Sequence, residues 1–458
     1  MLITAEQMAR FSIEAPRYTS YPTAAEFTPS VGAASYRDAL ERLPALLPVA
    51  LYVHLPFCRE ICHFCGCHAL VARTPDRIER YLACLGAEIS ATARTGGGGR
   101  SVVELHFGGG SPSFLAADDF ARVMDDLRGS FPFAPDVAVS MEADPRTIDG
   151  QKLLRYRALG VSRISFGIQD LDQGVQTAIG RHQSREVSLR AYQLARETGF
   201  TGVNLDLCYG LPGQTEETLS ATVDEVIGLR PDRVALFGYA HVPWLKPMQR
   251  LIAASSLPRA GLRLRMIAAV RAAFEAAGYV AIGLDHFALP ADELARAAAA
   301  GTLHRNFQGY TVTRTEALLG LGTSAISDLP SGYFQNHRQL GAYHRATDAG
   351  GLATERGVLR TADDVVRGEI IRTLMCQGRL DLAAIEQRFS LCFVQAFAPE
   401  VVALRGLEQD GLLHLDLGRK QLALTPLGSV FVRNVAREFD AHRRGVGPGT
   451  PARFSATV

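Results

Sequence analysis

Four of the chain's eight cysteines lie within ten residues, at Cys58, Cys62, Cys65 and Cys67. The first three follow the spacing C-x3-C-x2-C, and Cys67 adds a fourth thiol two residues later. The short apolar run 50–53 precedes them and predicts a buried strand. We therefore expect the cysteines to lie on a loop that leaves the carboxyl end of a strand.

Three thiolates at this spacing suit an iron–sulfur cluster, because soft sulfur ligands select iron–sulfur clusters or zinc. Typical clusters take four cysteines, so three would leave one iron open to a further ligand. A structural zinc site is the alternative, but it usually needs a second, separated cysteine pair that this sequence lacks. A disulfide framework is disfavoured by the length and by the absence of a secretory signal pattern. The scattered Cys84, Cys208, Cys376 and Cys392 are expected to be buried thiols.

Composition excludes several classes of partner. The 458 residues suffice for two or three domains, and 48 Lys and Arg balance 47 Asp and Glu. This balance gives no reason to expect binding to nucleic acid or to a membrane surface. No apolar run reaches the roughly 18 residues of a transmembrane helix. We expect a cytoplasmic protein.

From residue 48, short apolar runs alternate with longer helical patterns. The expected strands are 50–55, 102–107, 137–141, 163–168, 202–207 and 233–238, and the expected helices include 77–94, 117–128, 185–198 and 216–229. Six strand–helix units in series predict a parallel sheet, which right-handed crossovers would curl. The sequence thus predicts an α/β fold, a partial TIM-like (β/α)6 barrel, with an N-terminal arm and a mostly helical C-terminal domain.

The expected domains are an arm at 1–47, a barrel with its substrate-pocket extension at 48–358, a C-terminal domain at 359–445 and a tail at 446–458. In the arm, Pro16–Thr23 is expected to be extended, either as a strap or as a lid with Arg17 facing an anionic ligand. The C-terminal domain, with helices at 365–374, 382–389 and 394–410 and a hairpin, resembles a winged helix. A cover over the barrel is preferred to DNA binding.

Polar motifs follow the predicted strands at their carboxyl ends, where parallel barrels build active sites. They comprise the cysteine loop, Gly108–Pro112, Met141–Pro145, Gln169–Asp170, Asp206 and Tyr239–His241. The glycine run fits neither a Rossmann fingerprint nor a P-loop, but it would let the backbone approach a ligand closely. The stretch 304–311 mixes cations, amides and aromatics, which suits a flat ligand carrying carboxylates, although a solvated loop remains open. The stretch 318–327 is expected to be a turn of small residues.

These motifs together resemble the oxygen-independent coproporphyrinogen III oxidases, radical S-adenosylmethionine (SAM) enzymes of haem biosynthesis. The resemblance runs from Pro16 to about Asp440. It is carried by the cysteine loop and by the stretches 16–23, 52–54, 108–112, 209–212, 285–288 and 304–311.

The resemblance implies a [4Fe–4S] cluster on Cys58, Cys62 and Cys65 and two SAM molecules. The first SAM would contact Tyr52, Phe64, Gly109, Glu142 and Ile326. The second would contact Gly110, Ser111, Gln169, Arg181, Asp206 and Ala240. Cys67 and Arg17 are the expected catalytic residues.

The family's reaction decarboxylates two propionates of coproporphyrinogen III through a 5′-deoxyadenosyl radical and gives protoporphyrinogen IX. The family likeness also implies a monomer and an electron donor such as a flavodoxin or ferredoxin system. The alternative is a haem-binding chaperone or another radical SAM paralogue of the same fold. The fourth cysteine and the Arg17-Tyr18 arm separate the oxidases from those chaperones.

The chain departs from the family pattern at four places. The family usually has Tyr at His63, Asn at His68 and Trp at Phe107. Its Arg-Val pair near the C-terminus is Ala456-Thr457 here, so a contact of that end with the substrate is not carried over.

Overall fold

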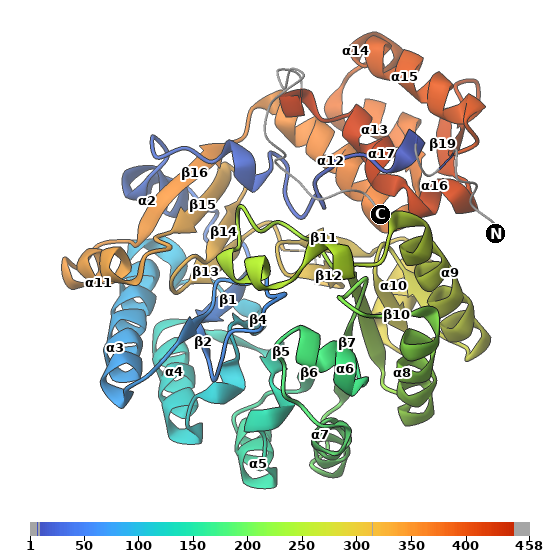
Figure 1. The fold of residues 1–458 in the computed structure, drawn as a ribbon. Coiled ribbons are helices and arrows are strands. Elements are labelled where there is room, and N and C mark those ends of the chain that lie inside the picture. The colour runs from blue at the N-terminus through green and yellow to red at the C-terminus, as the bar shows by residue number, and fades with distance from the viewer. Residues whose placement is uncertain (1–6, 8–9, 314, 444–458) are drawn as a thin grey trace.

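One twelve-stranded sheet forms the frame of the protein in the computed structural model, which describes residues 7, 10–313 and 315–443 (Figure 1). Its strand order is β16-β15-β14-β13-β1-β4-β5-β6-β7-β8-β10-β9. Six neighbouring strands are parallel: β1 (Val49–Leu55), β4 (Val102–Gly109), β5 (Phe133–Ala143), β6 (Arg163–Gln169), β7 (Gly202–Tyr209) and β8 (Arg233–Gly238). The predicted α/β class with a large parallel sheet is confirmed.

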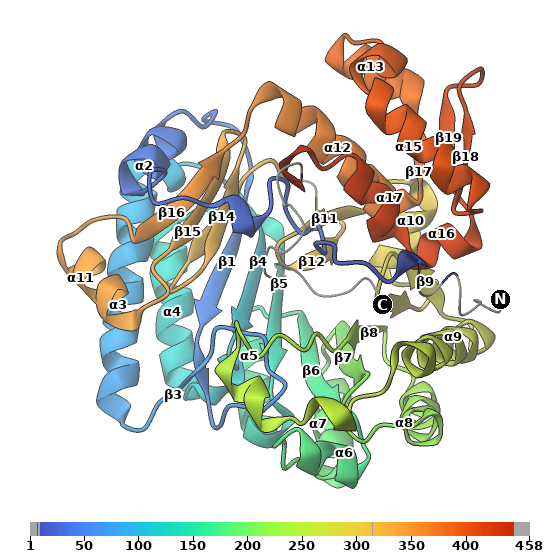
Figure 2. The ribbon, with the colours of Figure 1, turned by 45° about the horizontal axis from the view of Figure 1, so that its top comes forward.

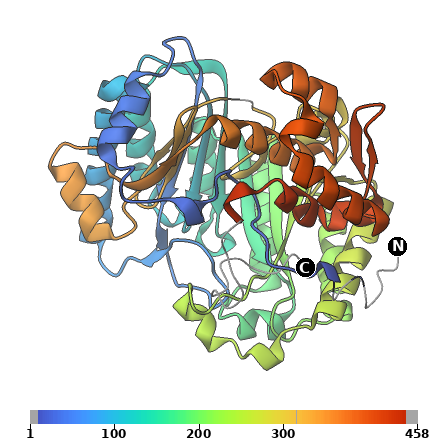
Figure 3. The same ribbon diagram turned by 90° about the horizontal axis from the view of Figure 1, so that it is seen from above.

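Helices cover the outer face of this curved sheet, as Figures 1 and 3 show. They are α3 (Pro75–Thr92), α4 (Ala117–Ser130), α5 (Gly150–Ala158), α6 (Gln173–Ala178), α7 (Arg185–Glu197), α8 (Glu216–Leu229) and α9 (Ala260–Ala276). The main apolar core lies between them and the sheet, with Leu105, Phe107, Phe166 and Leu205 almost fully buried. Alternation of strand and helix patterns in the sequence therefore predicted the layers correctly.

The sheet extends beyond the six predicted strands on both sides. On one side β13 (Leu318–Leu321) pairs parallel to β1, and β14 (Ile326–Leu329), β15 (Gly332–Asn336) and β16 (Thr354–Leu359) follow antiparallel. On the other side lie β10 (His286–Ala288) and β9 (Val280–Ile282). The expectation of a turn over 318–327 was wrong, because the apolar residues of 318–321 form a strand that pairs with β1.

The stretch 304–311 is a hairpin of β11 (His304–Asn306) and β12 (Gly309–Thr311). The remaining short elements of the barrel half are α2 (Ala33–Glu41), β2 (Phe57–Cys58), β3 (Leu70–Val71), α10 (Glu293–Ala300) and α11 (Leu340–Asp348).

A second apolar core holds the C-terminal part together with the N-terminal arm. The C-terminal elements are α12 (Ala362–Gln377), β17 (Arg379–Asp381), α13 (Leu382–Phe389), α14 (Phe393–Ala396), α15 (Ala398–Gln409), β18 (Leu413–Asp416), β19 (Gln421–Leu424), α16 (Pro426–Val430) and α17 (Val432–Glu438). Phe11, Tyr18 and Tyr21 of the arm are buried in this core, and the arm runs beside α17 (Figure 2). The arm therefore ties the C-terminal part to the barrel.

Two local expectations were wrong. The single helix expected over 394–410 is broken, because Pro399 has no N–H to continue it and instead begins α15. Cys392 is exposed, whereas Cys84, Cys208 and Cys376 are buried as expected. Within the described ranges, none of the helices combines the length and apolarity needed to traverse a bilayer. The tail predicted at 446–458, with Ala456-Thr457, lies outside the described residues.

Asp292 provides a stability test of the barrel. Its side chain is 2% exposed and pairs with Arg163 (2.8 Å) on β6 and Arg233 (2.7 Å) on β8. We expect Asp292→Asn to lower the free energy of unfolding by about 1.5–3 kcal/mol, because it removes the charge-assisted hydrogen bonds to the two arginines and leaves Glu293 as their remaining carboxylate partner. Because asparagine at position 292 can still cap α10, the substitution removes the negative charge and keeps the helix cap.

Burial raises the pKa of Asp292, but Arg233 and Arg163 outweigh it and hold that pKa below its usual value. The stabilisation is therefore present above the carboxyl's unfolded pKa and is lost as the pH falls through the folded one. Thermal unfolding at neutral and acidic pH checks this, with Asp149→Asn at the exposed cap of α5 as control. A melting temperature equal to that of the control would contradict the expectation.

Candidate active site

Backbone hydrogen bonds join the cysteine loop to the glycine run. In the β1–β4 pairing, Leu55 lies opposite Gly109. Past the end of the pairing, Gly110 N donates to Leu55 O (2.9 Å) and Ser111 N donates to Phe57 O (2.9 Å). The two loops that were predicted to meet at the carboxyl ends of their strands therefore lie side by side.

Glycine is required at two positions of this contact. Gly109 has φ +115°, and a Cβ there would lie 2.6 Å from Cε1 of His54. A Cβ on Gly110 would lie 2.5 Å from Pro56 O. Side chains at either position would separate the two loops, so the run is needed for close backbone approach.

The four clustered thiols are all free and differ in exposure. Cys62 is buried, Cys58 and Cys65 are partly buried, and Cys67 is exposed. Among the described residues no three His, Cys, Asp or Glu side chains converge to hold one metal ion. A cluster uses one thiolate for each iron, so its ligands need not meet at one point.

The residues present fit an iron–sulfur group, because they donate hydrogen bonds to the cysteine sulfurs. The properties of such a group depend on hydrogen bonds of this kind. Arg181 Nη1 donates to Cys62 Sγ (3.5 Å), and Cys67 N donates to Cys65 Sγ (3.4 Å). Burial raises the pKa of Cys58 to about 12, and the nearby Cys65 and Cys62 add to this. Hydrogen bonding from Cys67 lowers the pKa of Cys65 to about 6.

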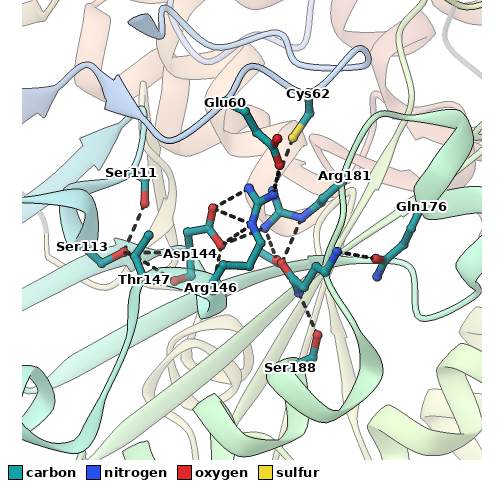
Figure 4. A network of polar contacts seen from close by, with 12 residues as sticks. Glu60, Cys62, Ser111, Ser113, Asp144, Arg146, Thr147, Gln176, Arg181 and Ser188 are labelled. Atoms are coloured by element: carbon teal, nitrogen blue, oxygen red, sulfur yellow. Dashed lines mark hydrogen bonds and ion pairs between the residues drawn. The ribbon is translucent and has the colours of Figure 1, made fainter. Parts of the chain in front are cut away.

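A network of charged side chains supports Cys62 from behind (Figure 4). Arg146 pairs with Asp144 (2.7 Å) and with Glu60, which lies between the first two cysteines. Asp144 also lies 3.7 Å from Arg181, which donates to Cys62. Sequence reasoning named Arg181 but missed Arg146, although its place just after the strand-end motif 141–145 was a usable signal.

The residues expected around the first SAM are joined by polar contacts. Gly109 N donates to Glu142 Oε2 (3.2 Å), and Tyr52 OH lies 3.0 Å from His54 Nδ1. His106, which the sequence analysis missed, stacks on Tyr52 and lies 3.6 Å from Glu142. Burial raises the pKa of Glu142, but His106 and the Gly109 N–H outweigh it, so the net pKa is lowered.

Two further residues of that set lie on neighbouring segments. Ile326 begins β14, and its carbonyl lies so close to Gly320 of β13 that a Cβ there would come within 2.5 Å. Phe64 packs on a small apolar cluster beneath the loop, and its carbonyl accepts from Gln249 Nε2 (3.0 Å).

Three of the residues expected around the second SAM lie on or just after β6, β7 and β8: Gln169, Asp206 and Ala240. Asp206 was expected at the end of its strand but lies within β7, three residues before Tyr209. Gln169 has φ +69° and ends β6. Asp206 accepts hydrogen bonds from Ser165 Oγ (2.9 Å) and Asn204 Nδ2 (2.7 Å), and burial raises its pKa to about 6. Ala240 follows β8 and accepts from Gln249 Nε2 (3.2 Å).

A cavity of about 210 Å³ opens inside the barrel beside these groups. Glu142 and Asp206 line it together with His286, Asn306 and Gln308. The predicted polar stretches 285–288 and 304–311 therefore contribute to the same interior as the strand-end carboxylates.

Two arginines, one partly buried and one buried, lie near the end of β8 and the hairpin 304–311. Arg17 Nη2 donates to Gly238 O (2.8 Å), at the end of β8. Arg305 is 7% exposed and stacks over Tyr310 at 4.4 Å, while its Nε and Nη1 find no hydrogen-bond partner among the described residues. Burial raises the pKa of Asp285, but His286, Arg305 and Arg17 bring it down to about 2. In the described part of the structure, Arg17 forms no hydrogen bond or ion pair with the cysteine loop.

Two family models match the chain. The Radical SAM superfamily matches residues 52–226, which contain the cysteine loop and the strand-end motifs. The HemN C-terminal domain matches residues 361–431.

Named relatives match nearly the whole chain. The oxygen-independent coproporphyrinogen III oxidase of Salmonella typhimurium is 42% identical over 435 residues, which are 95% of this chain and 94% of that protein. That of Bradyrhizobium diazoefficiens is 44% identical over 427 residues, 93% of this chain and 94% of that protein. The solved structure described as coproporphyrinogen III oxidase (HemN) from Escherichia coli, a radical SAM enzyme, matches with a TM-score of 0.89 at 41% identity and covers 93% of this chain and 97% of its own.

Gly110→Ala tests the contact between the two loops. We expect it to destabilise the protein by about 1–3 kcal/mol, because the new methyl group must push the Pro56–Phe57 backbone away. Gly99→Ala is the matched control, since nothing lies within 4 Å of a Cβ there. Thermal unfolding of both variants measures the difference, and equal melting temperatures would show that the loops are not in contact as described.

Proposed function

The chain belongs to the oxygen-independent coproporphyrinogen III oxidases of the radical SAM superfamily, and from this premise we propose that it converts two propionates of coproporphyrinogen III to vinyl groups, giving protoporphyrinogen IX without oxygen. The observation that carries the proposal is the cysteine loop packed on the glycine run at the carboxyl ends of β1 and β4. Active sites of parallel barrels are built on that face.

Cys58, Cys62 and Cys65 would hold a [4Fe–4S] cluster, with Arg181 donating to the sulfur of Cys62. When bound, that group supplies the electron that cleaves SAM to methionine and a 5′-deoxyadenosyl radical, which takes a hydrogen from the propionate of the substrate. The chain's own part is to hold the reactants in place and to exclude water and side reactions.

Two SAM sites are proposed. The first comprises Tyr52, Phe64, Gly109, Glu142 and Ile326, and the second comprises Gly110, Ser111, Gln169, Arg181, Asp206 and Ala240. For the first, the support is Glu142, whose lowered pKa keeps it ionised beside the glycine backbone and able to accept from an ammonium group. For the second, it is Asp206 on β7, whose carboxylate lines the interior cavity and suits ribose hydroxyl groups.

The substrate's four carboxylates need cationic partners. Arg17 and Arg305 supply them, because Arg305 retains two buried N–H donors without a partner in the described chain. Burying a guanidinium whose N–H groups lack acceptors costs free energy, unless a ligand accepts hydrogen bonds from them. Arg305 also borders a cavity of about 250 Å³ that Tyr18 and Tyr21 of the arm help to line.

Cys67 would take part in the reaction without binding iron, since a fourth thiolate would close the iron that SAM needs. We further propose that the protein acts as a cytoplasmic monomer. It would take electrons from a flavodoxin or ferredoxin system and bind neither nucleic acid nor a membrane. The balanced total of 48 basic and 47 acidic residues is consistent with this.

Anaerobic incubation with coproporphyrinogen III, SAM and a reductant tests the proposal. Protoporphyrinogen IX in the product supports the oxidase. The alternative is a haem-binding chaperone, which would retain haem and release no carbon dioxide. Haem retention without turnover would therefore overturn the proposal.

Arg17→Ala is expected to lower kcat/KM by about ten- to hundredfold, because losing a charge-assisted hydrogen bond costs about 1.5–3 kcal/mol. Iron content and melting temperature should stay near wild type. Arg10→Ala on the same arm is the control, since Arg10 pairs with Asp410 at the surface and is expected to keep full turnover. If Arg17→Ala loses stability but keeps its specific activity, the arm has only a structural role and takes no part in substrate handling.

A further inference from the structure

The segment 242–251, which follows β8, carries large apolar side chains at the surface. Trp244, Leu245, Met248 and Leu251 are 52%, 57%, 38% and 62% exposed. The other large apolar side chains exposed in the described part of the chain are scattered singly, which is ordinary for a protein surface. A concentrated group of this kind marks a surface that another molecule covers.

Hydrogen bonds fasten this segment to the cysteine loop. Lys246 Nζ donates to Cys67 O (3.2 Å), and Gln249 Nε2 donates to Phe64 O (3.0 Å). The two carbonyls lie on either side of Cys65 in sequence. In Figures 2 and 3 the yellow-green segment after β8 lies beside the blue loop that follows β1. The exposed apolar group is therefore part of the outer surface of the cysteine loop.

The segment itself carries charges of one sign only. The sequence from 234 to 274 contains no Asp or Glu. Lys246, Arg250 and Arg259 lie in it, and none of them pairs with a carboxylate in the described structure. An apolar centre with unpaired cations beside it complements an acidic partner, because opposite potentials steer encounter and set orientation.

We propose that Trp244, Leu245, Met248 and Leu251, with Lys246 and Arg250, form the docking surface for an acidic one-electron carrier protein. This rests on the proposed function, in which the cysteine loop holds a [4Fe–4S] cluster. One electron passes from the reduced carrier, which is thereby oxidised, to the cluster in the loop, and no bond forms or breaks. Redox partners of this kind meet through small, transient interfaces, which a patch of this extent can supply.

Stopped-flow reduction of the reconstituted protein, without substrate, tests the proposal. Reduced flavodoxin and dithionite are compared as donors on wild type, Arg250→Glu and the double variant Trp244→Ala/Leu251→Ala. Matched controls are Arg37→Glu, an exposed arginine of α2, and Leu46→Ala, which is 97% exposed in the wild type. Iron and sulfide are counted first.

We expect both patch variants to slow reduction by flavodoxin at least tenfold, while reduction by dithionite and both controls stay at the wild-type rate. Added salt should slow the wild type with flavodoxin and affect Arg250→Glu less. Equal loss with both donors would mean that the segment only supports the loop and would overturn the proposal. Unchanged reduction, together with a raised KM for coproporphyrinogen III in a separate turnover assay of the same variants, would overturn it in favour of a substrate lid. A wild type that takes up no iron would overturn the proposed function itself.

Discussion

The backbone pairing of β1 with β4 continues beyond the strands and positions the whole site. Gly110 and Ser111 donate to Leu55 and Phe57, so the glycine run and the cysteine loop form one unit. Because parallel strands place their carboxyl ends on one edge, Glu142, Gln169 and Asp206 come to the same side. This contact is possible because residues 109 and 110 are glycines, which have no side chains. The site is thus set by backbone geometry before any cofactor is bound.

The charged groups then divide the site into two regions. Behind the cysteine loop, Arg146 and Arg181 are compensated by Asp144 and Glu60, and Arg181 donates a hydrogen bond to the sulfur of Cys62. At the β8 edge, Arg305 lies near the carboxylate of Asp285, and its Nε and Nη1 have no hydrogen-bond partner in the described structure. The first region suits a cluster that needs no further anions, and the second suits a substrate with several carboxylates.

Sequence periodicity predicted the six parallel strands and their helices, since alternating strand and helix patterns over 48–238 have one regular packing. It also predicted that the cysteine loop and the glycine run would meet at the strand ends, whereas Asp206, which was expected there too, lies within β7. It missed β13, a four-residue strand next to a run of small residues, which is defined by its pairing with β1. It missed His106 and Arg146, because His106 acts through Glu142 of the neighbouring strand and Arg146 through Glu60 of the cysteine loop, and both partners are far away in sequence. The exposure of Cys392 likewise depends on how α13 and α14 pack rather than on local composition.

The central claim is that three cysteines hold the cluster and the fourth does not. Anaerobic reconstitution of Cys58→Ser, Cys62→Ser, Cys65→Ser and Cys67→Ser, with iron and sulfide counted per chain, tests it most directly. The account predicts that the first three variants lose the cluster, whereas Cys67→Ser keeps about four irons and about four sulfides and still binds SAM. A Cys67→Ser protein that loses its iron as completely as Cys62→Ser does would contradict the account.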